Sequence, residues 1–345
     1  MVASVPPSIV PLSADSSPLF SEEEINKIKA MTGIQQRVVA TDSICASDLM
    51  TDAAVDLLNR LNWSQDSIDL LVVVTQSGDY PLPATSCVAQ RNLGLSKGCM
   101  AFDIGLGCSG YTYGLSIVGA MMQGGQIRRA LLLAGDTSSR MASPTDRSTT
   151  LLFGDVGTAT ALEFCDDKGS AEAHWSFVGG TDGNGFANLI IPDGGFRNPS
   201  SEAGTVSSNG QLGRYLFMDG GEIFKFTIEV VPPLIAETLL LANKTIADVD
   251  YFLMHQANLF LLKHLSKKMK IMPERMPITL DRYGNTSCAS IPLTMIDGIG
   301  DKLDGRSLDL MLVGFGVGYS WGCLYLPIRK AVACGLKTFG KPVLG

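Results

Sequence analysis

Cys108 is the residue whose type and surroundings point most directly to chemistry. It lies in AFDIGLGCSGYTYGL, between an apolar strand-like run and the start of a helical pattern. Small neighbours let a ligand's carbonyl group approach the backbone closely. The dipole at a helix N-terminus favours the thiolate and lowers the thiol pKa, and the thiolate is the nucleophile. A small buried apolar residue is the alternative for a free cysteine, and the glycine-rich setting favours the nucleophile.

Two further polar side chains, and one glycine-rich turn, are candidates for the same chemistry. His255 ends a strand-like run in FLMHQAN, where α/β folds expose functional side chains, although a hydrogen-bonded core histidine is the alternative. Asn285, in DRYGNTSCAS, precedes a helical pattern and is equally typical of an N-cap. The turn GFGVGYSWG (314–322) offers backbone N–H groups for an oxyanion site or forms a β-bulge or hairpin. It lacks the spacing of a phosphate-binding loop.

The elements that must position Cys108 alternate between strand and helix patterns. Apolar runs at 68–75, 99–104 and 129–136 are predicted to be buried strands. Residues 110–125 have apolar positions at helical spacing and end in a glycine pair, which favours a helix. The order strand, helix, strand predicts a parallel sheet with helices on both faces.

The second half of the chain repeats this order. Its predicted strands are 249–255 and 308–316, and its predicted helices are 257–269 and 286–303. Asp69 opens a first-half strand and Asp250 opens the corresponding second-half strand. The offset of about 180 residues indicates an internal duplication, with chance similarity between short buried strands as the alternative.

Composition limits the class of protein. The chain has 345 residues, 46% of them hydrophobic, which excludes disorder as the main state. A net charge of −7 argues against nucleic-acid binding. No apolar run reaches the roughly 18–20 residues of a membrane helix, and prolines interrupt the start MVASVPPSIVPL, unlike a signal peptide. Eight cysteines without a CxxC pair, and three histidines, predict no metal site or disulfide framework. We therefore expect a protein of the reducing cytoplasm.

Taken together, these stretches resemble β-ketoacyl–acyl carrier protein synthase III, a condensing enzyme of the thiolase superfamily. The resemblance extends from about Lys29 to about Leu326. Its motifs, in the family's order, are KAMTGIQQR, GCMAFDIGLGCSGYTYGL, SPTDRSTTLLFGD, GGEIFKF, MHQANL, TLDRYGNTSCAS and GFGVGYSWG. It implies an α/β fold, a thiolase-like duplicated five-layer αβαβα sandwich, in a cytoplasmic homodimer that needs no cofactor.

Four segments follow from the resemblance and from composition. The expected N-terminal half (1–165) carries the nucleophile, and the C-terminal half (214–328) carries the histidine and the asparagine. Between them, residues 166–213 are rich in Gly, Ser, Asn and Asp, which is typical of a loop-rich connection with a short hairpin. No role is assigned to the tail, 329–345.

The resemblance also implies a mechanism. Cys108 attacks an acyl thioester, usually acyl-CoA, while the backbone N–H groups of Cys108 and Val317 hold the oxyanion. A malonyl thioester on an acyl carrier protein then enters, and His255 and Asn285 donate hydrogen bonds to its carbonyl group. As CO₂ leaves, the resulting enolate attacks the acyl-cysteine and gives a 3-oxoacyl product.

Several phosphate-binding positions of the family are altered. Arg147 and Lys225, two expected substrate-binding residues, are retained. Lys27 stands where the family often has a tryptophan that stacks on the coenzyme adenine. Met31 and Phe260 stand where the family has arginines. Two basic contacts to coenzyme or carrier phosphates are therefore missing.

Leu82 is the expected distal contact of the acyl chain. In the family, a residue near this position crosses the dimer interface into the partner's acyl pocket, and leucine there favours a longer or branched acyl group.

Two other enzyme classes of the superfamily are disfavoured. A degradative thiolase needs a second cysteine, which the glycine-rich turn lacks. A hydroxymethylglutaryl synthase needs a catalytic glutamate, for which no matching position is present. An acyltransferase with an alcohol or amine acceptor stays open, as does a non-catalytic acyl-binding partner subunit. The presence of all three catalytic residues argues against the latter.

Overall fold

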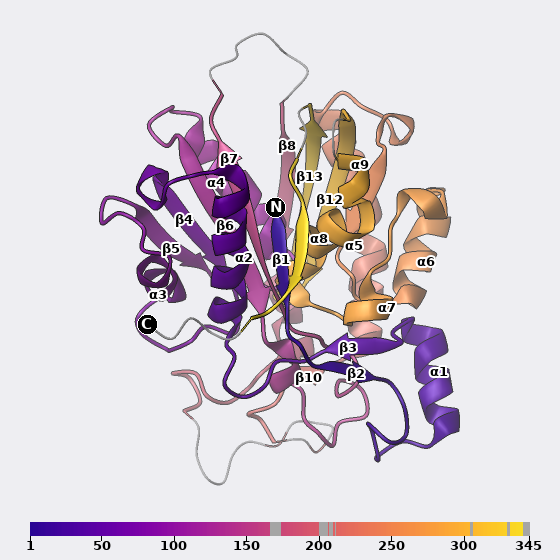
Figure 1. Ribbon diagram of the computed structural model, residues 1–345. Coiled ribbons are helices and arrows are strands. Elements are labelled where there is room, and N and C mark those ends of the chain that lie inside the picture. Colours follow the sequence, from indigo (N-terminus) through magenta and orange to yellow (C-terminus); the bar gives the residue numbers. More distant parts are fainter. Residues whose placement is uncertain are drawn as a thin grey trace.

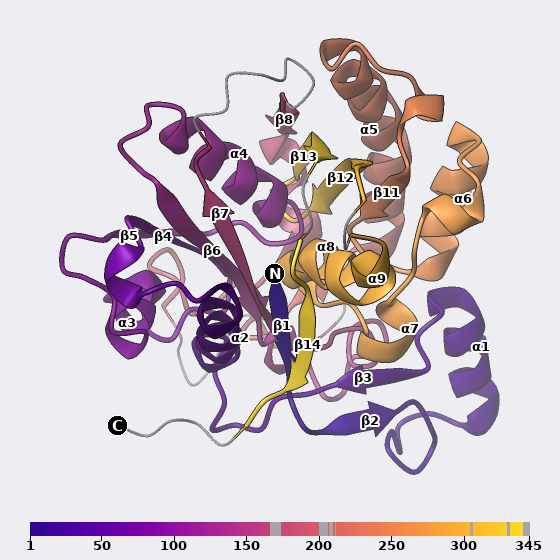
Figure 2. The ribbon, with the colours of Figure 1, turned by 45° about the horizontal axis from the view of Figure 1, so that its top comes forward.

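The computed structural model describes residues 1–165, 174–199, 206, 210, 212–303, 306–329 and 332–340. Two β-sheets lie side by side at the centre of the molecule, one built mainly from the first half of the chain and one from the second (Figure 1). Helices lie between the two sheets and on both outer faces (Figure 2).

The N-terminal sheet has six strands in the order β14-β1-β7-β6-β4-β5. Their bounds are β14 Gly335–Thr338, β1 Val2–Val5, β7 Val156–Glu163, β6 Arg129–Asp136, β4 Leu70–Val74 and β5 Met100–Ile104. Strand β4, next to the edge strand β5, pairs in parallel with both β5 and β6. The three strands predicted in the first half are thus confirmed as neighbours in one sheet.

The C-terminal sheet has four strands in the order β11-β12-β13-β8. Their bounds are β11 Tyr251–Met254, β12 Leu308–Gly316, β13 Ser320–Ile328 and β8 Ser176–Thr181. Two shorter pairs complete the strands, β2 (Ile9–Pro11) with β3 (Gln36–Val38) and β9 (Leu189–Ile190) with β10 (Phe217–Met218).

The internal duplication is present in the sheet topology. The series β4-β6-β7-β1 and β11-β12-β13-β8 share one pattern, a parallel pair followed by two antiparallel pairs. The Asp69 carboxylate accepts the backbone N–H of Arg129 at 3.0 Å, at the start of β6. Asp250 accepts the backbone N–H of Asp309 at 2.7 Å, at the start of β12. The matching aspartates therefore join matching strands in the two halves.

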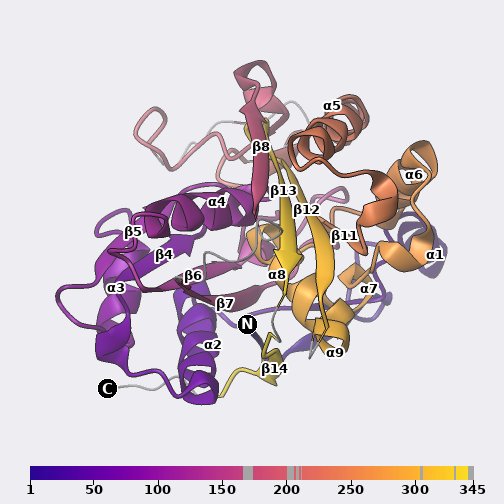
Figure 3. The same ribbon diagram turned by 90° about the horizontal axis from the view of Figure 1, so that it is seen from above.

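Helices complete five layers, αβαβα (Figure 3). One outer layer holds α2 (Ala46–Leu61) and α3 (Thr85–Asn92), and the other holds α5 (Gly220–Leu241) and α6 (Leu259–Met269). The central layer holds α4 (Gly110–Met122), α8 (Ser290–Leu293) and α9 (Ile299–Leu303). The remaining helices are α1 (Glu22–Thr32), which lies beside α6, and the short α7 (Leu280–Tyr283).

Alternating side chains of the strands join the layers. In β4, Leu70, Val72 and Val74 pack into the central core, whereas Leu71 and Val73 pack against the outer helices. Successive strand residues point to opposite faces, so a fully apolar strand serves two layers at once. The continuous run LLVVV is therefore the sequence expected of a strand buried on both faces. This arrangement confirms the thiolase-like sandwich expected from the sequence.

The helix predicted at 286–303 is broken. It consists of a 3-10 turn at Ser287–Ala289, α8, a π-helical turn at Thr294–Gly298, and α9. Ser287 has a positive φ of 51°, which is incompatible with an α-helix. Pro292 lacks the N–H group that a continuous helix would need.

Three strands, β8, β9 and β14, lie in segments that were expected to be loop or tail, which corrects that part of the sequence reading. β8 falls within 166–213, and the Trp321 ring covers its Gly180, where a Cβ atom would come within 2.6 Å of the indole. This glycine therefore makes room for an aromatic ring rather than for a turn. β14 falls within 329–345 and pairs in parallel with β1. The four-segment division as a whole stays a prediction.

The described ranges contain no helix that is both long and apolar enough to cross a bilayer. Within the same ranges, no group of three or more His, Cys, Asp or Glu side chains is arranged to hold a metal ion.

Candidate active site

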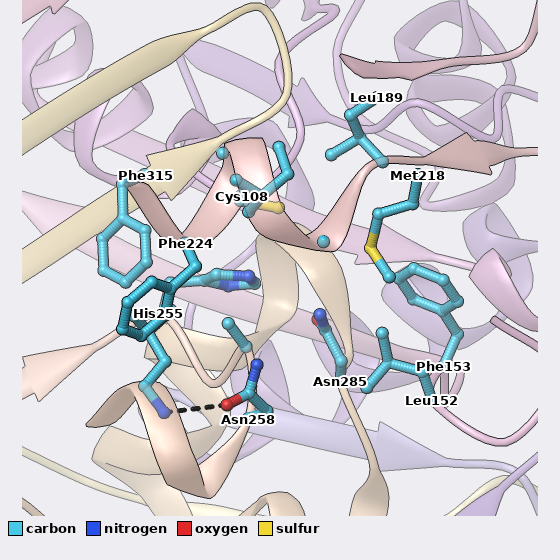
Figure 4. Close-up of a pocket in the computed structure, with 15 residues that line it drawn as sticks. Cys108, Leu152, Phe153, Leu189, Met218, Phe224, His255, Asn258, Asn285 and Phe315 are labelled. Carbon is cyan, nitrogen blue, oxygen red and sulfur yellow. Dashed lines mark hydrogen bonds between the residues drawn. The ribbon is translucent and has the colours of Figure 1, made fainter. Parts of the chain in front are cut away.

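Cys108, His255 and Asn285 converge on one pocket between the two halves (Figure 4). Cys108 lies two residues before the start of α4, His255 follows β11, and Asn285 lies two residues after α7. The pocket has a volume of about 100 Å³. The three residues that the sequence placed far apart therefore form one site.

Glycines in β12 let the Cys108 turn lie directly against that strand. A Cβ atom on Gly314 would be 2.8 Å from the Cys108 carbonyl oxygen, and one on Gly316 would be 2.8 Å from Cys108 Sγ. The buried hydroxyl groups of Ser109 and Ser320, 2.7 Å apart, join the cysteine turn to the start of β13. Part of the glycine-rich motif is therefore needed for close packing at the cysteine, and the motif itself forms the hairpin between β12 and β13.

Burial controls the protonation of Cys108 more than the helix terminus does. Burial raises the pKa of the Cys108 thiol to about 11, and the nearby Asp136 carboxylate also raises it. Hydrogen bonds from the backbone N–H groups of Val317 and Cys108 and from the Ser287 hydroxyl lower this pKa. The lowered pKa expected from the sequence is thus wrong in direction, because desolvation outweighs the donors.

His255 is neutral at pH 7. Its side chain is 2% exposed, and burial lowers its pKa to about 4. Nδ1 lies 2.8 Å from the Ser290 hydroxyl oxygen, and the ring meets Phe315 edge to face with 5.6 Å between ring centroids. A neutral imidazole carries a single N–H group, so the Ser290 contact decides which nitrogen faces the pocket as a donor.

The amide of Asn285 has a defined orientation. Its Oδ1 accepts the backbone N–H of Ser287 at 3.0 Å, which leaves the Nδ2 group as the end available to the pocket. The backbone is also fixed, since its N–H donates to the Leu152 carbonyl and its carbonyl accepts from Gly154, both at 2.9 Å. Asn285 therefore presents a donor and not a helix N-cap.

Ser287 is a site residue that sequence reasoning missed. Its N–H donates to the Asn285 amide oxygen. Its hydroxyl group lowers the pKa of the Cys108 thiol, and its backbone raises the pKa of the His255 ring. The positive φ of 51° is uncommon for a residue other than glycine, and such residues cluster at functional sites. No sequence signal marked this residue, because it lies within a stretch with a helical pattern.

Apolar side chains line most of the pocket. They are Leu152, Phe153, Leu189, Met218, Ile223, Phe224, Leu261 and Phe315. They come from several separate strands, helices and loops, so no periodic pattern within one element marked them as a common lining. A pocket with this lining and a few polar groups at its base suits an acyl chain with one reactive carbonyl group.

The expected phosphate-binding cations lie outside the pocket lining. Arg147 forms an ion pair with Glu24, donates to the Leu19 carbonyl at 2.8 Å, and lies over the Phe20 ring at 5.3 Å. Lys225 is exposed on α5, directly after the pocket residue Phe224.

The altered positions are exposed. Lys27 forms an ion pair with Glu23 at 2.7 Å. Met31 is 58% exposed, and Phe260 is 56% exposed and packs against Phe224 with 5.6 Å between ring centroids. Leu82 is 82% exposed and does not line the pocket of its own chain.

Comparison with known proteins identifies the family. A family profile described as 3-oxoacyl-[acyl-carrier-protein (ACP)] synthase III matches residues 102–183, and the profile of its C-terminal part matches residues 239–328.

Among similar proteins, a β-ketoacyl-[acyl-carrier-protein] synthase III of Caldanaerobacter subterraneus subsp. tengcongensis is 34% identical over 85% of this chain and 86% of its own length. A protein of the same name from Clostridium tetani is 35% identical over 86% of this chain and 88% of its own length. A crystal structure of a 3-oxoacyl-(acyl-carrier protein) synthase from Burkholderia xenovorans LB400 has 44% identity and a TM-score of 0.91, and the match covers 98% of this chain and 95% of that one. The chain therefore belongs to the 3-oxoacyl-[acyl-carrier-protein] synthase III family of acyl-transferring condensing enzymes.

Proposed function

We propose that the chain transfers an acyl group from acyl-CoA to Cys108 and then condenses it with malonyl–acyl carrier protein, releasing CO₂ and a 3-oxoacyl–acyl carrier protein. The observation that carries this proposal is the convergence of one thiol, two backbone donors and two side-chain donors in one apolar pocket. Family membership supports it independently.

In the first step, Cys108 Sγ bonds to the acyl carbonyl carbon. The backbone N–H groups of Cys108 and Val317 already hydrogen-bond at the sulfur, so they are near the oxygen that becomes negatively charged. The thiol proton passes through neutral His255 to the leaving coenzyme thiolate. The bond from the acyl carbon to coenzyme sulfur breaks, and an acyl-cysteine forms.

In the second step, the malonyl thioester loses CO₂ and negative charge moves onto its carbonyl oxygen. The Nδ2 group of Asn285 and an N–H group of His255 donate to that oxygen. Preorganised donors of this kind contribute about 3 kcal/mol each to the transition state. The enolate carbon then attacks the acyl-cysteine carbonyl and releases Cys108.

Ser290 sets the tautomer of His255 in this scheme. When its hydroxyl donates to Nδ1, the single proton of the neutral ring lies on Nε2. Nε2 is then the donor to the malonyl carbonyl, and the low pKa of His255 keeps the ring neutral through the physiological range.

The substrates and the assembly are part of the same proposal. The reaction needs no cofactor, and the protein works as a cytoplasmic homodimer. The exposure of Leu82 supports the proposal that this loop inserts into the partner's acyl pocket. Lys225 and Arg147 bind phosphates of the coenzyme or the carrier protein, and Arg147 must leave its ion pair with Glu24 to do so.

Separate half-reactions test this function. Purified protein is incubated with acyl-CoA thioesters of increasing chain length, and its intact mass is measured. CO₂ release from malonyl–acyl carrier protein is followed in a second assay. We expect the mass of one acyl group on wild type and none on Cys108→Ala. Acylation of Cys108→Ala, or transfer to alcohols or amines in preference to the malonyl thioester, would overturn the proposal.

A further inference from the structure

Asp136, the last residue of β6, is a fully buried carboxylate without a part in the condensation steps. Its Oδ1 accepts four hydrogen bonds, from the Thr75 hydroxyl at 3.0 Å, the Gln76 N–H at 2.8 Å, and the Ser77 N–H and hydroxyl at 3.1 and 3.0 Å. All four donors belong to Thr75–Ser77, the segment that follows β4. One carboxylate oxygen therefore fixes three consecutive residues.

The second oxygen of this carboxylate, Oδ2, takes no part in these four hydrogen bonds. Oδ2 is buried and has no hydrogen-bond partner among the described residues. The Cys288 thiol, which donates to the Val74 carbonyl at 3.3 Å, lies close to Asp136.

The segment Thr75–Ser77, held by Asp136, packs closely against the turn that carries Cys108. A Cβ atom on Gly107, the residue before Cys108, would be 2.2 Å from Gln76 Oε1. The Ser77 hydroxyl also accepts the Thr137 N–H at 2.9 Å, which ties the segment back to β6. The contacts thus run from Asp136 through Gln76 to Gly107 and Cys108.

We propose that Asp136 is a positioning residue that holds Thr75–Ser77 against Gly107, and that its negative charge acts on the Cys108 thiol. This rests on Cys108 being the nucleophile of the proposed function. Asp136 from β6, Cys288 from the 3-10 turn and His255 after β11 are the titratable groups that face Cys108. The Asp136 charge raises the pKa of Cys108, so removing it shifts thiolate formation to lower pH.

Alkylation by iodoacetamide tests the charge without any thioester. The rate at the Cys108 peptide is measured by mass spectrometry from pH 6 to pH 11 in wild type and Asp136→Asn. Asparagine keeps the acceptor oxygen and loses the charge. We expect the pH at which the alkylation rate is half-maximal to be lower by about one pH unit in Asp136→Asn than in wild type. The matched control is Asp103→Asn, since Asp103 also accepts backbone N–H groups, from Thr85 and Ser86 at 2.7 Å. Its midpoint should equal that of wild type.

Ser77→Ala separates positioning from charge. It removes the hydroxyl between Asp136 and Thr137 and keeps the carboxylate. We expect an unchanged alkylation midpoint and an acylation rate constant about tenfold lower, with little change in KM for the acyl donor. An unshifted midpoint in Asp136→Asn, or full acylation by Ser77→Ala, overturns the proposal. If Asp136→Asn does not fold, the Ser77→Ala acylation rate decides. A wild type that alkylates at Cys108 but never acylates would refute the proposed function instead.

Discussion

His255 should make the stability of the protein depend on pH in a defined window. Burial lowers its pKa from 6.5 to about 4 in the folded state. The unfolded chain therefore binds more protons than the folded one between these values. The contribution of His255 to stability is fully present above pH 6.5 and is lost as the pH falls towards 4. The perturbation is a change from pH 7 to pH 5, in wild type and in His255→Gln.

The magnitude follows from the shift. The difference between a pKa of 6.5 and one of about 4 corresponds to about 3 kcal/mol over the whole window. Between pH 7 and pH 5 the linkage relation gives about 2 kcal/mol. Because every other titrating group is common to both proteins, subtracting the pH dependence of His255→Gln isolates this contribution.

Urea denaturation at a fixed protein concentration measures the effect. From pH 7 to pH 5, wild type should lose about 2 kcal/mol more of its unfolding free energy than His255→Gln does. Between pH 7 and pH 8 the difference between the two proteins should stay constant, which serves as the internal control. Parallel losses down to pH 5 would refute the inference that a neutral, desolvated imidazole lies at the base of the pocket.

Three further substitutions test the site. Asn285→Ala should slow malonyl decarboxylation by about 10²–10³-fold and acylation by less than tenfold, measured as separate half-reactions; equal losses would contradict the assigned role. Leu82→Phe should shift the preference among acyl-CoA donors towards shorter chains at an unchanged Tm, and an unaltered chain-length profile would remove this residue from the acyl pocket. Gly316→Ala places a methyl group about 2.8 Å from Cys108 Sγ, so iodoacetamide should alkylate Cys108 at least about tenfold more slowly; wild-type alkylation would show that the turn can move away.

The repeated strands and helices could be predicted because strands buried on both faces appear in the sequence as continuous apolar runs. LLVVV and LDLMLVGFG are apolar on both faces, as strands between two helix layers must be. Asp69 and Asp250 marked the duplication, since each carboxylate accepts a backbone N–H at the start of the neighbouring parallel strand in its own half. The predicted site residues Cys108, His255 and Asn285 lie at ends of these regular elements, where position along the chain predicts position in space.

The features that the sequence did not predict depend on contacts between distant segments. Gly180 resembles a loop residue until Trp321 is placed across from it. The direction of the Cys108 pKa shift depends on how completely protein surrounds the sulfur, and the helix terminus alone predicted the opposite. Ser287 acquires its role from a positive φ that interrupts a helix-like stretch. Asp136 likewise gains its role from a segment about 60 residues earlier in the chain.

A single-turnover chase tests the central claim most directly. Wild-type protein is loaded with one equivalent of acyl-CoA, malonyl–acyl carrier protein is added, and samples are quenched over time for peptide and product mass. We predict that the acyl mass first appears on the peptide containing Cys108 and then disappears at the rate at which 3-oxoacyl–acyl carrier protein forms. Product formation while the acyl mass stays on Cys108, or with the acyl mass on another residue, would contradict the account.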